Sequence, residues 1–173
     1  MPNPPYADLI RDIPDFPRPG ILFRDITPLL GDAEGFAAAV RDLAAPYRNA
    51  SIDRVVAVEA RGYLLGAPVA LELGAGLVPV RKKGKLPYEV LRAEYTLEYG
   101  EEAVEVHRDA LRPGERVLIV DDVLATGGTM AAAAALVERT GAAVAGAAVL
   151  IELMALRGRD RLQELPLTAS IVY

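Results

Sequence analysis

The sequence lacks cysteine, and histidine and serine are almost absent. Its 173 residues include one histidine, His107, and two serines, Ser51 and Ser170. Disulfide bonds, thiolate zinc sites and a cysteine nucleophile are therefore excluded. A Ser/His/Asp triad or a multi-histidine metal site would need residues that this chain barely has. Any catalysis must depend on carboxylates, arginine, lysine, backbone amides and an imported metal.

A long apolar run is also missing. No stretch approaches the roughly 20 uncharged residues of a membrane span, and residues 1–8 do not form a basic and apolar signal sequence. We therefore expect a cytoplasmic protein with no membrane partner. The net charge of −5 argues against a nucleic-acid partner held by general basicity. A small anionic substrate remains compatible, because residues 81–85 carry four cations in five positions.

The composition that is present suits a globular α/β protein, with 52% hydrophobic and 25% charged residues. The length and the absence of repeats or linkers predict a single domain over 1–173. Apolar, β-branched runs predict strands at 54–58, 77–80, 116–120, 142–151 and 168–172. Helical stretches are expected at 62–73, 128–140 and 156–165. This alternation predicts a mainly parallel twisted sheet flanked by helices, with ligands bound at the carboxyl ends of its strands.

The N-terminal part departs from this alternation. A proline-rich lead at 16–24 precedes a helix expected at 33–45, for which Asp32 is the N-cap. The sequence therefore predicts a small N-terminal hood over about 1–35.

The second departure is a pair of segments with alternating polar and apolar residues. Residues 93–100 and 103–107 alternate with period two, which predicts an antiparallel hairpin joined at 100–102. Together with the basic, glycine-bearing loop before it, this hairpin would form a flexible β-hairpin lid over about 81–107.

The most informative segment is 117–129, VLIVDDVLATGGT. It leaves an apolar strand through the adjacent acids Asp121 and Asp122 and enters a helix at the glycines 127–128. These glycines allow a close backbone approach, and a helix N-terminus offers unpaired N–H groups to a phosphate monoester. Ionised carboxylates repel phosphate but accept hydrogen bonds from the hydroxyls of a ribose diol. The segment therefore predicts a sugar-phosphate site.

This segment resembles the phosphoribosyl-pyrophosphate (PRPP) motif of the type I phosphoribosyltransferases. Residues 16–27, 59–70, 78–87 and 97–100 resemble the adenine-using members of that family, so that the likeness runs from about residue 13 to the end. The resemblance implies the type I phosphoribosyltransferase fold. It also implies a purine-salvage reaction that transfers the 5-phosphoribosyl group from PRPP to N9 of adenine, forming AMP and pyrophosphate.

The resemblance further implies which residues bind PRPP. They are Asp121, Asp122, Leu124, Ala125, Thr126, Gly127, Gly128, Thr129, Arg61, Arg81 and Lys85. Arg61 would bind the pyrophosphate with its fork of donors. Arg81 and Lys85 would reach it from the mobile loop, and in the homodimer that the resemblance implies they could do so across the interface. Mg²⁺ would arrive mainly bound to PRPP, without a dedicated protein site.

Proton handling and base recognition complete the implied site. Periodicity alone would place Glu98 on a solvated face, but the match at 97–100 makes Glu98, together with Arg61, the candidate catalytic residue. Adenine would be bound by the backbone at Leu22 and Arg24 and by Phe23, Leu153 and Tyr99. A backbone carbonyl and N–H pair would read the amine and ring nitrogen of adenine and reject a 6-oxo purine.

Two alternatives stay open. The acceptor base could be hypoxanthine, guanine or xanthine, with the PRPP site unchanged. The chain could also be a regulator that senses PRPP without turnover, although the acidic balance and the lack of an added nucleic-acid-binding region count against this.

Overall fold

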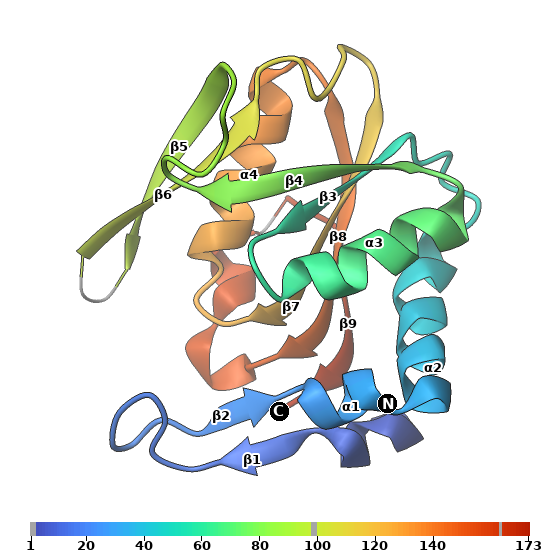
Figure 1. The fold of residues 1–173 in the computed structure, drawn as a ribbon, viewed down its shortest axis with the longest axis vertical. Helices are drawn as coiled ribbons and strands as arrows, with labels where there is room; N and C mark the ends of the chain where they lie inside the picture. The colour runs from blue at the N-terminus through green and yellow to red at the C-terminus, as the bar shows by residue number, and fades with distance from the viewer. Residues whose placement is uncertain (1–2, 98–99, 163) are drawn as a thin grey trace.

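The computed structural model describes residues 3–97, 100–162 and 164–173, and a seven-stranded sheet forms its centre (Figure 1). The strands lie in the order β5-β6-β4-β3-β7-β8-β9. Their bounds are β3 Arg54–Val58, β4 Gly76–Lys82, β5 Val90–Leu97, β6 Gly100–His107, β7 Arg116–Leu124, β8 Ala143–Glu152 and β9 Leu167–Val172. Each neighbouring pair in the series β4-β3-β7-β8-β9 is parallel. Strand β6 pairs antiparallel with both β4 and β5. The predicted α/β fold with a mainly parallel sheet is confirmed.

Helices cover both faces of this sheet. Helices α2 (Ala33–Ala44) and α3 (Gly62–Leu73) pack on one face, and α4 (Gly128–Arg139) packs on the other. Successive residues of β3 show the division, because Val55 packs with α2 and α3 while Val56 packs with α4. Burial on both faces explains why the central strands are continuous apolar runs in the sequence.

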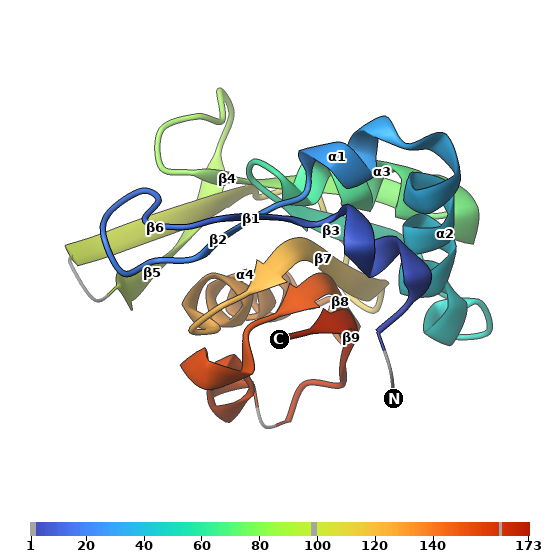
Figure 2. The same ribbon diagram turned by 90° about the horizontal axis from the view of Figure 1, so that it is seen from below.

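A separate two-stranded sheet is built from the N-terminal residues. Strands β1 (Arg11–Ile13) and β2 (Phe23–Asp25) pair antiparallel, with the 3-10 helix η1 (Pro5–Leu9) before them and α1 (Thr27–Gly31) after them. Figures 1 and 2 show this small sheet outside the main one, near the C-terminus. Helix α2 then begins after Asp32, whose side chain accepts a hydrogen bond from the Gly35 N–H at 2.8 Å, as the sequence predicted.

One expected helix is wrong. Residues 156–165 were expected to be helical, but the described part of this stretch holds only the end of η3 (Met154–Leu156) and the short 3-10 helix η4 (Gly158–Arg161). Arg157 separates the two helices with φ of 52°, in the left-handed region, which interrupts a helix. A further 3-10 helix, η2 (Ala45–Tyr47), follows α2.

Three strand boundaries also differ from the expectation. Strand β7 continues to Leu124, so that the paired acids lie within the strand and not after it. Strand β4 continues to Lys82, so that Arg81 belongs to the strand. Leu97 pairs with Gly100, and the expected connection at 100–102 is therefore part of β6. No helix of the described residues is long and apolar enough to cross a membrane.

Candidate active site

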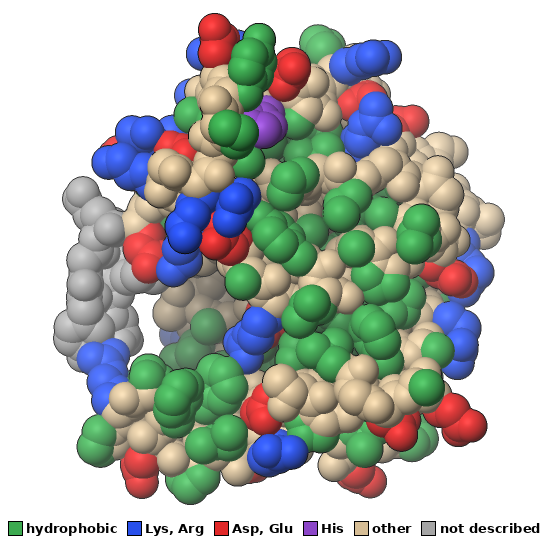
Figure 3. All heavy atoms as spheres, viewed as in Figure 1, with side chains coloured by type: hydrophobic (Ala, Val, Ile, Leu, Met, Phe, Trp, Pro, Cys, Tyr) green, Lys and Arg blue, Asp and Glu red, His purple; other side chains and the backbone are tan. Residues whose placement is uncertain are grey.

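A hollow of about 410 Å³ opens where the carboxyl ends of β3, β4 and β7 meet the β5–β6 hairpin. A second hollow of about 140 Å³ lies along the turn from β7 into α4. Asp121 and Thr129 line both, so the two hollows adjoin. In Figure 3 a deep hollow is visible between the N-terminal sheet and the hairpin region, and Lys and Arg side chains gather along its upper rim.

The smaller hollow is formed by residues 124–129, which we call the phosphate cradle. Gly127 precedes α4 with φ of 81°, a left-handed conformation that favours glycine. Among the described residues, no side chain caps this helix N-terminus. Its free N–H groups and the positive end of the helix dipole therefore face the hollow, which is an arrangement suited to a phosphate.

The paired acids lie at the entrance to the cradle. Asp122 is buried, and Oδ1 of Asp121 accepts a hydrogen bond from the Asp122 N–H at 2.9 Å. Burial raises the pKa of both carboxyls, and the charge of Asp122 raises the pKa of Asp121 further. Hydroxyl donors of a sugar would stabilise the ionised forms and oppose this shift.

Arg61 connects the acids to the N-terminal sheet. Its Nε lies 2.7 Å from Oδ2 of Asp122, and this ion pair lowers the pKa of Asp122 against the effect of burial. Its guanidinium carbon lies 4.8 Å from the ring centroid of Phe23, and Nη1 lies 3.5 Å from the Arg24 carbonyl oxygen. The sequence predicted that Arg61 binds the pyrophosphate, and the structure places it between Asp122 and strand β2.

Residues 81–85, which we call the basic loop, are held by carboxylates. Oε2 of Glu59 accepts hydrogen bonds from the Lys82 N–H at 2.9 Å and from Arg81 Nε at 3.3 Å. Arg81 also donates to the Lys85 carbonyl at 3.0 Å. The pKa of Glu59 is low because these donors outweigh the effect of burial. Arg81 is therefore already paired in this structure, whereas the side chain of Lys85 is exposed.

A second carboxylate, Glu105 of β6, holds the same loop from the hairpin. It is buried, and its Oε2 accepts a hydrogen bond from the Gly84 N–H at 2.9 Å. Its Oε1 lies 2.8 Å from Nε and 2.7 Å from Nη2 of Arg92. These donors keep the pKa of Glu105 low in spite of its burial. No role was predicted for Glu105 from the sequence, and only the pairing of β4, β5 and β6 brings it together with its two partners, Gly84 and Arg92.

The expected adenine residues lie in two places. Leu22 is exposed and Phe23 packs edge-on against Phe16 with ring centroids 5.1 Å apart. Arg24 lies over the ring of Tyr173, 3.7 Å from its centroid. Leu153 follows β8, and its N–H donates to the Leu124 carbonyl of the cradle at 3.0 Å.

Two expected site residues lie outside the part of the chain that the structure describes. Glu98 and Tyr99 are not among the described residues, so their expected roles remain predictions. The structure adds Tyr95, Glu102 and Lys82 to the cleft lining. Tyr95 donates to Oε2 of Glu102 at 2.9 Å across the hairpin. Sequence alternation put Tyr95 on one face of the strand, but only the register of the hairpin reveals its partner.

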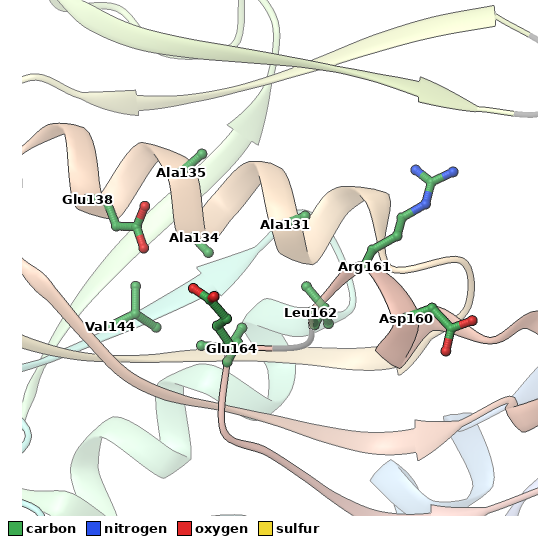
Figure 4. Close-up of a pocket in the computed structure, with 10 residues that line it drawn as sticks. Ala131, Ala134, Ala135, Glu138, Val144, Asp160, Arg161, Leu162 and Glu164 are labelled. Carbon is green, nitrogen blue, oxygen red and sulfur yellow. The ribbon is translucent and has the colours of Figure 1, made fainter.

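A further hollow of about 570 Å³ shares no lining residue with the two described above. It lies between α4 and residues 160–162 and 164–165, and its lining includes alanines of α4 together with Glu138, Asp160, Arg161 and Glu164 (Figure 4). The acids outnumber the single cation in this lining, which does not suit a phosphate ligand.

Known proteins resemble this chain over nearly its whole length. The model of the phosphoribosyl transferase domain matches residues 30–166. An adenine phosphoribosyltransferase of Roseiflexus sp. (strain RS-1) is 54% identical over 167 residues, which cover 96% of this chain and 97% of that protein. An adenine phosphoribosyltransferase of Acidothermus cellulolyticus is 60% identical over 153 residues, covering 88% of this chain and 86% of that protein.

Solved structures agree with the sequence relatives. The crystal structure of adenine phosphoribosyltransferase from Thermoanaerobacter pseudethanolicus superposes with a TM-score of 0.95 at 49% identity, covering 97% of this chain and 98% of that one. The predicted resemblance is confirmed, and the chain belongs to the phosphoribosyl transferase domain family, among its adenine phosphoribosyltransferases.

Proposed function

We propose that this protein transfers the 5-phosphoribosyl group of PRPP to N9 of adenine, producing AMP and pyrophosphate for purine salvage. The observation that carries this proposal is the continuous cleft in which the phosphate cradle, the paired acids and Arg61 adjoin. A site of this kind can hold a phosphate, a ribose diol and a second anionic group in a fixed order.

The reaction forms the N9–C1′ bond and breaks the bond from C1′ to the pyrophosphate oxygen. That oxygen leaves with the electron pair, and adenine loses its N9 proton. The cradle would hold the 5′-phosphate through backbone N–H groups, and Asp121 and Asp122 would accept hydrogen bonds from the ribose hydroxyls. Holding both ends of the sugar orients C1′ toward the incoming nitrogen and reduces the entropic cost of the step.

The leaving pyrophosphate would be bound by Arg61, Arg81 and Lys85. Arg81 would exchange Glu59 for the pyrophosphate, and Arg61 would exchange Asp122, since each arginine is paired in this structure. The described residues include no group of three or more His, Cys, Asp or Glu side chains placed to hold a metal ion. Mg²⁺ would arrive bound to PRPP and would supply charge neutralisation at the pyrophosphate, and the paired acids would touch it only indirectly.

Adenine would lie against the N-terminal sheet. The backbone of Leu22 and Arg24 would pair with the amine and ring nitrogen, and Phe23 and Leu153 would form apolar walls. Glu98 would take part in proton transfer at the purine imidazole nitrogens, with Tyr99 beside it. These assignments are supported by the sequence match and by the position of Phe23 and Arg24 next to Arg61.

We further propose a homodimer in the cytoplasm. The support for the dimer is a set of exposed leucines on α3 and β4, namely Leu64, Leu71 and Leu77, of which Leu71 is 83% exposed. A second copy of the chain covering these leucines would bury apolar surface along α3 and the start of β4, the strand that leads into the basic loop.

A panel of purine bases tests the proposed function. Purified protein with PRPP and Mg²⁺ is supplied with adenine, hypoxanthine, guanine or xanthine, and nucleotide and pyrophosphate are measured. We expect AMP and an equal amount of pyrophosphate with adenine only. Turnover of hypoxanthine but not adenine would reassign the substrate, and PRPP binding with no turnover of any base would indicate a sensor.

A further inference from the structure

Residues 154–162, which we call the buttress, press against the back of the phosphate cradle. A Cβ atom added to Gly127 would lie 2.4 Å from the Gly158 carbonyl oxygen. Reciprocally, a Cβ atom added to Gly158 would lie 2.4 Å from the Ala125 carbonyl oxygen and 2.8 Å from Cγ of Leu124. The two backbones are therefore in direct contact, and neither position has room for a side chain.

An ion pair between the buried Glu152 and the half-exposed Arg159 fixes the buttress in this place. Glu152, the last residue of β8, is 6% exposed. Its Oε1 and Oε2 each accept a hydrogen bond at 2.7 Å, from Nε and Nη2 of Arg159 respectively. Arg159 also donates from Nη1 to the Leu167 carbonyl at 3.1 Å, and its pKa is raised by Glu152. A two-point pair of this kind sets both the position and the orientation of the guanidinium.

Two further contacts hold the ends of the buttress. At its start, the Met154 N–H donates to the Tyr173 carbonyl at 2.9 Å. At its end, Leu162 is buried in the apolar cluster beneath α4, where Figure 4 shows it near Ala131. The buttress is thus attached to β8, to the C-terminus and to the helix whose N-terminus forms the cradle.

We propose that Arg159 and Gly158 are positioning residues for the 5′-phosphate. The Glu152–Arg159 pair holds the Gly158 backbone against Gly127, and this contact keeps the N–H groups of the cradle directed at one point. The proposal rests on the proposed function only for the identity of the ligand, a phosphate monoester of a ribose. It predicts that disturbing the buttress weakens phosphate-bearing ligands selectively and leaves the free base unaffected.

The test compares ligands that differ in the 5′-phosphate. Binding of AMP, ribose 5-phosphate and adenine is measured by calorimetry for the wild type and for Arg159→Ala, Arg159→Lys and Gly158→Ala. We expect Arg159→Ala and Gly158→Ala to weaken AMP and ribose 5-phosphate about tenfold and to change adenine affinity less than about twofold. Arg159→Lys keeps the charge but loses the two-point geometry, and we expect an intermediate loss.

Arg157→Ala is the matched control, because Arg157 belongs to the same segment and pairs at 2.7 Å with Asp160, but on the exposed surface. It should bind all three ligands as the wild type does. Equal weakening of AMP and adenine, or a lowered melting temperature with wild-type ribose 5-phosphate affinity, would overturn the proposal. If Arg159→Ala fails to fold, Arg159→Lys and Gly158→Ala decide the outcome.

Failure of the proposed function gives a different result. If the wild-type protein binds ribose 5-phosphate but not adenine, the proposed transfer to adenine is contradicted. The affinity of the variants for ribose 5-phosphate would still test the role of the buttress.

Discussion

The phosphate cradle and the basic loop would bind opposite ends of the same substrate, yet they are built from different groups. The cradle presents backbone N–H groups between β7 and α4, and a second backbone at Gly158 supports it. The basic loop presents side-chain cations, and Arg81 is already paired with Glu59. In the proposed site the cradle would therefore bind a phosphate without rearrangement, whereas Arg81 would exchange Glu59 for the pyrophosphate.

This difference suits the chemistry of each end. The 5′-phosphate is present in substrate and product alike, so a rigid site for it serves both. The pyrophosphate must be bound and then released. In the proposed site, Asp122 and Glu59 would again pair with Arg61 and Arg81 when the pyrophosphate leaves. Carboxylates would in this way limit how tightly the product is held.

The largest expected effect is a loss of turnover caused by a substitution in the predicted lid. Glu98→Gln removes the proposed proton-transfer group, and we expect kcat to fall about a thousandfold with little change in PRPP affinity. Steady-state kinetics with adenine and PRPP measures both values. Glu94→Gln, at an exposed position of β5, is the control and should leave kcat unchanged. A similar small loss in both variants would remove Glu98 from catalysis.

The next largest expected effect is a loss of PRPP binding caused by substitutions beside the phosphate cradle. Asp121→Asn together with Asp122→Asn replaces two charged acceptors of ribose hydroxyls, each worth about 1.5 kcal/mol. We expect PRPP to bind about a hundredfold more weakly, with adenine binding unchanged. Calorimetry with PRPP and Mg²⁺ measures this, and Asp109→Asn on the exposed surface is the control. Unchanged PRPP affinity would contradict the diol assignment.

A smaller effect is expected from Glu105, which shapes the basic loop from a distance. Glu105→Gln keeps an oxygen for the Gly84 N–H but weakens the pair with Arg92. We expect the KM for PRPP to rise about fivefold, while ribose 5-phosphate affinity stays at the wild-type value. Loss of ribose 5-phosphate affinity as well would show that cradle and loop are not independent.

The pH dependence of stability should have opposite signs in the two regions. Asp121 has a raised pKa, so the folded state holds its proton more strongly than the unfolded state, and stability falls as pH rises above about 4. Glu105 has a lowered pKa, so its contribution is present at neutral pH and is lost as pH falls below its ordinary value.

Urea unfolding at several pH values measures this contrast. Relative to the wild type, Asp121→Asn should gain stability as pH rises, and Glu105→Gln should lose its deficit as pH falls. Parallel curves for the two variants would contradict the assigned pKa directions.

The smallest effect is expected for Lys83, whose side chain is exposed in the basic loop. Lys83→Ala should change the KM for PRPP less than about twofold at physiological salt, because exposed charges are screened. Arg81→Ala, measured in parallel, should raise it several-fold. Equal effects from both residues would show that the loop acts through its summed charge and not through individual contacts.

Much of the fold could be predicted because local patterns and burial agree. The apolar runs at 54–58 and 116–120 became β3 and β7, and Asp32 caps α2 as its residue type suggests. The expected helix at 156–165 failed because tertiary contact overrides local preference there. Gly158 must fit against Ala125, and Arg157 adopts a left-handed conformation before it.

By itself, the sequence predicted the type of ligand and the groups that would bind it. The order of strand, paired acids, threonines and glycines at 117–129 is local, and its chemistry follows from residue types within one turn. Only the tertiary structure decided what supports these groups. Glu105 with Gly84 and Glu152 with Arg159 are joined by strand pairing and chain reversal. A single buried glutamate in a sequence does not reveal its partner, because the energy of burying its charge is offset by whichever donors the fold brings to it.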